Sequence, residues 1–306
     1  MAQSLPLESV PTPALTPANG PETTATLVAS GATHIGQHRH RNEDAYLIAT
    51  LQRSMVLHDA SPGAARGWLA GQPAGTLLVV ADGMGGMGSG DVASHVAVET
   101  VSGYLLNVMS WAAKKEAAQE SRERSVTLPD VREQLSSAIA VGDETVKSAG
   151  MQIGAPDMGT TLTIALVSWP VLYVAHVGDS RCYLLRSGQL SRLTTDHTLA
   201  QQLAEQSGGE RQAPESWHHV LWNSLGGHAL PEPQICKHLL ELDDVLLLCS
   251  DGLTYHVGDP QIAEILSREQ TNPARCEALI AAANQLGGMD NITVVVATAD
   301  KGSTRS

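Results

Sequence analysis

Phenylalanine is absent from this 306-residue sequence, and aromatic residues make up only 3% of it. A folded core must therefore be built from Val, Leu, Ile and Ala, and the 42% of hydrophobic residues suffices for one. Basic residues are also scarce, since 19 Lys and Arg stand against 32 Asp and Glu, a formal net charge of −13. This balance disfavours general binding to nucleic acid or to an anionic membrane, and we expect neither as a partner.

Long apolar runs and paired cysteines are missing as well. No segment approaches the roughly 18 apolar residues of a membrane span, and no charged-then-apolar leader opens the chain. The cysteines show no CxxC spacing, which argues against a zinc site or a disulfide framework. They are Cys182, Cys236, Cys249 and Cys276. We therefore expect a reduced, cytoplasmic, acidic protein.

Composition divides the chain into a tail and one domain. Residues 1–24 are rich in Pro and Thr, so we expect a flexible tail there, a single folded domain over 25–300 and a short tail over 301–306. Two stretches, 51–74 and 112–127, interrupt the structured pattern, and a solvated loop or helix face is the favoured interpretation of each.

Strand and helix patterns alternate along the domain. The sequence predicts strands at 27–33, 45–50, 76–81, 160–168, 172–177, 182–186, 190–193, 245–250 and 292–298. It predicts helices at 91–109, 128–147, 197–206, 259–267 and 273–286. The connections between 160 and 193 are too short for crossover helices, so we expect those strands to form one antiparallel meander. Clustered strands with helices before and after predict an antiparallel sheet with covering helices.

Aspartates stand at the ends of several predicted strands: Asp44, Asp82, Asp157, Asp251 and Asp290. Any one alone is more readily a turn or cap residue. If the strand ends converge, however, repulsion among the carboxylates would drive their protonation unless cations neutralise them. Oxygen ligands of this kind select Mg²⁺ or Mn²⁺.

Two neighbouring features suit phosphoryl chemistry. The glycine after Asp82 permits close backbone approach, so the carbonyl of Gly83 is a further candidate ligand. Two hard metals about 3.5–4 Å apart activate a water for in-line attack on a phosphoryl group. Arg39, shortly before Asp44, is the candidate for a bidentate phosphate contact.

The short motifs that contain these residues, and the order in which they occur along the chain, resemble those of the metal-dependent Ser/Thr protein phosphatase family, the protein phosphatase 2C type, in its bacterial form. The matching stretches are Arg39–Asp44, Asp82–Gly86, Asp157–Thr161, Gly178–Arg181, Thr194–His197, Ser250–Leu253 and Asp290–Thr293. The resemblance implies an α+β fold, a four-layer α-β-β-α sandwich of two antiparallel sheets flanked by helices. It places the site at one edge, between the sheets.

The resemblance also implies a ligand set. Asp82 would bridge two Mn²⁺ or Mg²⁺ ions. Asp44 and the carbonyl of Gly83 would bind the first ion, and Asp251 and Asp290 the second. The implied reaction is hydrolysis of phosphoserine and phosphothreonine in proteins, by a water between the two ions, in opposition to a bacterial Ser/Thr kinase.

Three further roles follow from the same resemblance. Glu43 would hold metal-bound water, and Arg39 would hold the substrate phosphate. Asp157 would bind a third, weaker ion that it shares with Asp251. A mobile flap beside the site would occupy the segment near 200–230.

The sequence departs from the family at the expected proton donor. Relatives commonly carry a His where this chain has Met84 or Met87, and Met cannot transfer a proton, so the general acid is either another group or a metal-bound water. His40 is a candidate acid, although His38 and His40 equally suit exposed loop positions. A non-catalytic relative that binds metal or phosphoproteins is therefore the alternative function, which the complete carboxylate set disfavours. We expect a monomer.

The remaining polar motifs have structural interpretations. In the flap segment, the two Trp and two His between Trp217 and Trp222 suggest a grip on substrate or metal. The pattern of Val220, Leu221 and Leu225 also fits ordinary packing under a loop, which is favoured. Metal binding by His218 and His219 is disfavoured because adjacent side chains point apart. Ser180 has no general base beside it, so a tight turn is expected there. Asp196 suits a helix cap, followed by His197 as a surface or packing residue.

Overall fold

The computed structural model describes residues 25–57, 67–108, 130–209, 211–268 and 271–301. Its strands are β1 Ala25–His34, β2 Asp44–Leu57, β3 Gly67–Met84, β4 Gly159–Thr160, β5 Leu162–Ser168, β6 Val171–Val177, β7 Arg181–Arg186, β8 Gln189–Arg192, β9 Gln234–Leu239, β10 Val245–Cys249 and β11 Ile292–Lys301. Its helices are α1 Gly90–Val108, α3 Val131–Ile153, α4 Leu199–Gln206, α5 Asp251–Thr254, α6 Asp259–Ser267 and α7 Asn272–Gln285, with 3₁₀ turns η1 Gly86–Gly88 and η2 Glu215–His219.

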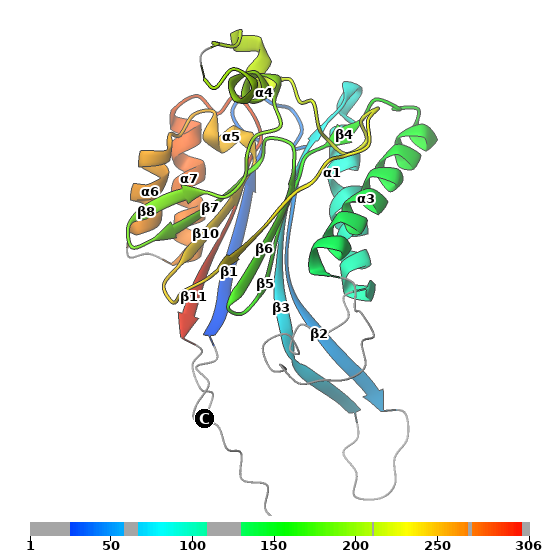
Figure 1. Cartoon of the computed structure of the whole chain (residues 1–306), viewed down its shortest axis with the longest axis vertical. Coiled ribbons are helices and arrows are strands. Elements are labelled where there is room, and N and C mark those ends of the chain that lie inside the picture. The colour runs from blue at the N-terminus through cyan, green and yellow to red at the C-terminus, as the bar shows by residue number, and fades with distance from the viewer. Residues whose placement is uncertain (1–24, 58–66, 109–129, 210, 269–270, 302–306) are drawn as a thin grey trace, which may run out of the picture.

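The strands form two antiparallel sheets that face each other (Figure 1). One sheet has the order β1-β11-β10-β7-β8, and the other has the order β2-β3-β5-β6-β9, with β4 paired to the end of β3. Helices α1 and α3 cover the outer face of the second sheet, while α6 and α7 cover the outer face of the first (Figure 1). The four-layer α-β-β-α sandwich implied by the resemblance is confirmed.

Unbroken apolar strands suit this layering because both faces of each sheet are covered. In β10, Leu246 and Leu248 face the opposite sheet, whereas Leu247 packs toward the helices of its own side. In β3, Leu78 and Val80 likewise point between the sheets. Fully burying each such side chain contributes about 1.5–3 kcal/mol. The core between the sheets therefore holds the two halves in a fixed relation at the edge where the aspartates lie.

The predicted meander over 160–193 is wrong. Strands β5 and β6 pair in one sheet, but β7 and β8 belong to the other, so the chain crosses between sheets at residues 178–180. Gly178 permits this crossing with φ +110°, and a Cβ there would lie 2.5 Å from the Thr161 side chain. The partner of β6 is instead β9, a strand that the sequence patterns did not indicate.

Several predicted boundaries also change. The stretch 51–74 is no simple loop, since β2 and β3 extend through much of it as a hairpin, with 58–66 outside the described residues. The tail over 1–24, the stretch 112–127 and most of the tail over 301–306 also lie outside them; β11 reaches Lys301. Helix α4 is capped by Thr198 rather than Asp196, because the Thr198 hydroxyl accepts a hydrogen bond from the backbone N–H of Gln201. None of the described helices is long and apolar enough to span a bilayer.

Candidate metal centre

Four of the predicted aspartates converge at one edge of the sandwich. Asp44 begins β2 and lies directly opposite Asp82, near the end of β3. Asp251 follows β10, and Asp290 precedes β11, so both lie at the corresponding edge of the other sheet. Ser250 joins the sheets there, because its hydroxyl donates to Asp44 Oδ2 at 2.7 Å. Because these strands are antiparallel and their ends meet at this edge, residues far apart in the sequence become adjacent.

The loop before β2 is held by Asn291, the residue after Asp290. The Asn291 amide nitrogen donates to the carbonyls of Ile35 and Arg41 at 2.9 Å each. Its Oδ1 accepts from the Glu43 backbone N–H at 2.8 Å. Asn291 is buried, and these bonds satisfy both ends of its side chain. The short strand-end motif thus also positions the loop that carries the predicted phosphate and water ligands.

Gly83 lies where three backbone segments meet. Its N–H donates to the Glu43 carbonyl at 3.1 Å, and a Cβ at this position would come within 2.0 Å of the Gly90 carbonyl. Only glycine therefore fits. Glu43 Oε1 accepts from the N–H of Gly90, the first residue of α1, at 3.2 Å, where the helix terminus favours negative charge.

Burial and mutual repulsion act strongly on these carboxyl groups. The pKa of Asp44 is raised to about 7, first by burial and then by Asp251 and Asp290, against hydrogen bonds that lower it. Burial raises the pKa of Asp82 well above its usual range, and Asp44 and Asp251 add to the effect. The pKa of Asp251 is also raised, by burial and by Asp290. A cation among them would remove the reason for protonation.

The donor set fits a hard divalent cation. Two buried oxygens, Asp44 Oδ1 and Asp251 Oδ1, have no hydrogen-bond partner. Such acceptors are costly unless something binds them. Within the described part of the chain, no three His, Cys, Asp or Glu side chains are already gathered as a closed set of metal ligands. The side chains of the four aspartates offer oxygen donors, the type that Mg²⁺ and Mn²⁺ prefer.

The other predicted site residues differ in their placement. Arg39 lies against the cluster, with Nη2 at 2.5 Å from Asp290 Oδ2 and 52% of its side chain exposed. His40 is exposed and has no hydrogen bond or ion pair with the described residues. Asp157 is exposed as well, and no contact joins it to Asp251; it lies shortly before β4, which pairs with Gly83 and Met84.

Sequence interpretation missed Asp179. The stretch containing it is the crossing between sheets, which brings Asp179 beside the cluster rather than into a surface turn. Burial raises its pKa well above the usual range, and Asp251 and Asp196 add to this. The match of Gly178–Arg181 to the family motif was the available signal. Ser180 is buried and its hydroxyl is 2.8 Å from that of Thr161, in agreement with a structural role.

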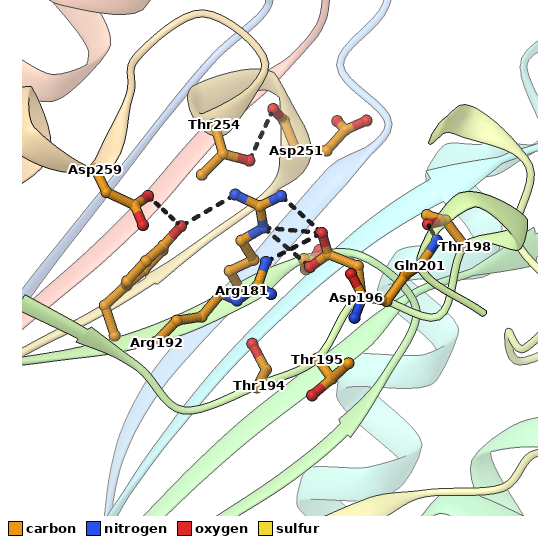
Figure 2. Close-up of polar contacts among 12 residues, drawn as sticks. Arg181, Arg192, Thr194, Thr195, Asp196, Thr198, Gln201, Asp251, Thr254 and Asp259 are labelled. Carbon is orange, nitrogen blue, oxygen red and sulfur yellow. Dashed lines mark hydrogen bonds and ion pairs between the residues drawn. The ribbon is translucent and has the colours of Figure 1, made fainter. Parts of the chain in front are cut away.

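A polar cavity of about 460 Å³ opens beside the cluster. Asp179 and Asp251 line one side, and residues of α4 and η2 line the other. Between them, the Arg181 guanidinium donates to Asp196 at 2.6 and 2.9 Å, and Arg192 approaches Asp196 at 3.3 Å (Figure 2). Asp196 therefore holds two arginines in place at the cavity wall.

The segment after α4 is anchored at its base and exposed at its tip. Rings of His176, His197 and Trp222 stack in sequence at 4.9 and 5.0 Å beneath it. Burial lowers the pKa of His176 to about 3, so that ring is neutral. The predicted packing is confirmed for Leu225, which is fully buried, but is wrong for Val220, which is 43% exposed. Trp217, His218 and His219 are exposed too.

Comparison with known proteins gives a consistent set of matches. A family model described as protein phosphatase 2C matches residues 51–288. The serine/threonine phosphatase Stp of Listeria monocytogenes is 34% identical over 229 residues, which are 73% of this chain and 84% of that protein. The Mycobacterium tuberculosis serine/threonine phosphatase PstP superposes with a TM-score of 0.69 at 29% identity, covering 90% of this chain and 99% of that one. The catalytic domain of PstP in complex with two manganese ions gives a TM-score of 0.67 at 29% identity, covering 90% and 100%.

Proposed function

Because this chain belongs to the protein phosphatase 2C family, it is a metal-dependent serine/threonine phosphatase of phosphoproteins, and we propose that its aspartate cluster holds two Mn²⁺ or Mg²⁺ ions. The observation that carries this proposal is the gathering of the buried Asp44 with the half-buried Asp82 and Asp251, all with raised pKa values and two of them with an unpartnered buried oxygen. When bound, the ions would supply an activated water for in-line attack on phosphorus.

The ligand roles follow from which sheet each residue occupies. Asp82, which faces Asp44 on its own sheet and acts electrostatically on Asp251 of the other, would bridge the ions. Asp44 and the Gly83 carbonyl would hold one ion, and Asp251 and Asp290 the other. These assignments are proposals of roles for residues that already lie together.

A third, weaker ion is proposed near Asp251. Asp157 is its second ligand in our proposal, although Asp157 is exposed and makes no contact with Asp251. Asp179 adds to the rise in the Asp82 pKa, and Asp251 adds to the rise in the Asp179 pKa. A loose site of this kind suits weak binding, because few of its ligands are preorganised.

Two residues would act on the substrate side. Arg39, which contacts Asp290 through one nitrogen, would leave it and hold two oxygens of the phosphate with its guanidinium. Glu43 has one oxygen fixed by the Gly90 N–H, so its second oxygen would accept from the attacking water and orient it. Positioning of both reactants is the larger part of such catalysis.

The wider context is also part of the proposal. We propose that the substrates are proteins phosphorylated by a bacterial Ser/Thr kinase and that the enzyme acts as a monomer in the cytoplasm. Support for the compartment comes from the four cysteines, all of which are free thiols and three of which are buried. Residues 25–300 would form one phosphatase domain, with the segment near 200–230 as its flap.

Two substitutions can distinguish the proposed role of Asp82, binding both ions, from that of Arg39, binding the substrate phosphate. Asp82→Asn should remove charge shared by both ions and reduce turnover of a phosphothreonine peptide by at least roughly a thousandfold. Arg39→Ala should raise KM and lower kcat together by about 1.5–3 kcal/mol of transition-state stabilisation, the scale of a lost charge-assisted contact.

Calorimetric titration with Mn²⁺ distinguishes the two variants. Arg39→Ala should bind Mn²⁺ much as the parent does, since it contributes no ligand, whereas Asp82→Asn should not. Near-parental metal affinity and turnover in Asp82→Asn would show that Asp82 is not the bridge.

A further inference from the structure

The proposed reaction leaves one requirement without a residue. When the phosphorus–oxygen bond of phosphoserine or phosphothreonine breaks, the departing alkoxide is a strong base and needs a proton. The thioethers of Met84 and Met87 cannot supply one. His40, the candidate from sequence, is exposed and does not line the cavity beside the aspartates. A metal-bound water or a side chain from another part of the chain must therefore supply it.

His219 lies at the right place. It closes the 3₁₀ turn η2 and lines the cavity together with Asp251 and Asp179. Its ring packs against the Tyr255 ring at 5.3 Å, just beyond α5, the helix that Asp251 begins. Tyr255 packs edge-on against His256, whose Nε2 accepts from the Met289 N–H at 3.0 Å. The His219 ring therefore packs on Tyr255, which packs on His256, and His256 is hydrogen-bonded to Met289, the residue before Asp290.

His219 and Arg39 approach Asp251 from separate segments of the chain. His219 lines the same cavity as Asp251 and comes from the segment after α4, whereas Arg39 comes from the loop before β2. Both side chains oppose the rise in the Asp251 pKa. No hydrogen bond or ion pair joins His219 to Asp251, which leaves the ring nitrogens available. We propose that His219 is the proton donor to the leaving oxygen.

Other groups around the cavity are less suited to this role. Arg181 is committed to Asp196 and does not release a proton at neutral pH. His218 lines the cavity too but has no ring contact to orient it. The charged and titratable groups that face His219 are Glu215 and His218 on its own segment, and Asp179, Arg181, Arg192, Asp196, Asp251 and Tyr255 on the others.

The step balances without a further reactant. The water oxygen forms a bond to phosphorus while the bond from phosphorus to the serine or threonine oxygen breaks. The imidazolium proton of His219 passes to that leaving oxygen, and the attacking water releases one proton to solvent. Solvent then reprotonates the neutral imidazole. This inference rests on the proposed function and adds the residue that completes it.

Leaving-group chemistry tests the role of His219. The full chain with Mn²⁺ is assayed on a phosphothreonine peptide, whose alkoxide needs a proton, and on p-nitrophenyl phosphate, whose phenolate leaves without one. His219→Gln should lower kcat on the peptide by about 100-fold or more, and on p-nitrophenyl phosphate by less than about 5-fold. His218→Gln is the matched control, and its ratio of the two activities should remain that of the parent.

Chemical rescue supplies a second readout. Free imidazole should restore part of the peptide activity of His219→Gly and should not change that of the parent. Equal losses on both substrates in His219→Gln, or a shift of the ratio in His218→Gln as large as in His219→Gln, would overturn the proposal, because either result indicates a role in shaping the flap. A parent enzyme inactive on both substrates in Mn²⁺ would instead overturn the proposed function itself.

Discussion

At the scale of single residues, Asp44 shows that a proposed metal ligand can lower the stability of the metal-free fold. Its side chain is 4% exposed; Oδ2 accepts from Ser250, while Oδ1 has no partner. A buried acceptor without a partner costs about 1–3 kcal/mol, more when charged. Without a cation the group avoids this cost by staying protonated, so its pKa rises from the ordinary 3.8 to about 7. Its chemistry suits an ion more than it suits the metal-free fold.

This pKa predicts an unusual dependence of stability on pH. Because the folded value exceeds the unfolded one, the folded state binds the proton more tightly, and this contribution to stability is lost as pH rises from about 4 to about 7. In chelator, the free energy of unfolding measured by urea should therefore fall between about pH 5 and pH 7, by on the order of 2 kcal/mol. Saturating Mn²⁺ should reduce the fall, since the ion binds the ionised form.

The variant Asp44→Asn provides the check on that assignment. It keeps the shape of the side chain and removes its titration, so the loss of stability with rising pH should be smaller than in the parent. An equal loss in both proteins would mean that Asp82, Asp179 or Asp251 accounts for the effect instead.

Sequence patterns predicted some of these residues better than others. Asp44, Asp82, Asp251 and Asp290 could be found because each adjoins an apolar strand whose end is visible in the sequence. Asp179 could not, because Gly-Asp-Ser has the same composition whether the chain turns back or crosses to another sheet. His219 was not predicted as a catalytic residue, because its exposure beside Asp251 depends on how an irregular segment folds, and no periodicity describes that.

At the scale of elements, strand positions were more predictable than strand partners. Alternating polar and apolar residues, and apolar runs, located the described strands with two exceptions. The very short β4 was not distinguished from β5, and β9, which pairs with β6, was not predicted. Pairing depends on contacts between distant residues, such as β1 with β11 and β7 with β10. A three-residue connection over 178–180 is compatible with a hairpin as well as with a crossing, so the meander was a reasonable but incorrect expectation.

The crossing between sheets predicts that substitution by Ala destabilises the fold more at one of two glycines with similar backbone geometry. Gly178 and Gly188 both have positive φ, +110° and +80°. A Cβ at Gly178 would lie 2.5 Å from the Thr161 side chain, whereas one at Gly188 meets nothing within 4 Å. Gly188→Ala should cost about 1 kcal/mol for backbone strain alone. Gly178→Ala should cost about 2–4 kcal/mol, because overpacking adds to the strain.

Urea unfolding of both variants measures this difference. Gly178→Ala should also lower activity, since Thr161 accepts the Asp82 N–H at 2.9 Å and would be displaced. Equal destabilisation by the two substitutions would mean that the crossing tolerates a side chain and that its glycine serves only the backbone angle.

At the scale of the whole molecule, the site joins the two sheets. Besides the apolar layer between them, polar contacts connect the halves at this edge; among them, Ser250 donates to Asp44, Arg39 pairs with Asp290, and Asn291 accepts from Glu43. The carboxylates themselves repel one another across the boundary. Ions bound among ligands from both sheets would replace this repulsion with attraction, so metal binding should stabilise the molecule as a unit rather than one sheet.

The stability of the whole fold should therefore depend on metal through ligands from each sheet. At a free Mn²⁺ concentration of 100 times Kd, the free energy of unfolding should rise by about 2.7 kcal/mol for each ion bound, relative to the value in chelator. Asp44→Asn alters one sheet and Asp251→Asn the other, and each should remove most of that increment. Asp259→Asn should keep it, because Asp259 accepts from the Tyr183 hydroxyl at 3.0 Å in α6 and lies outside the cluster. If only one of the two cluster variants loses the increment, the ions bind to a single sheet, and the edge between the sheets is not the metal site.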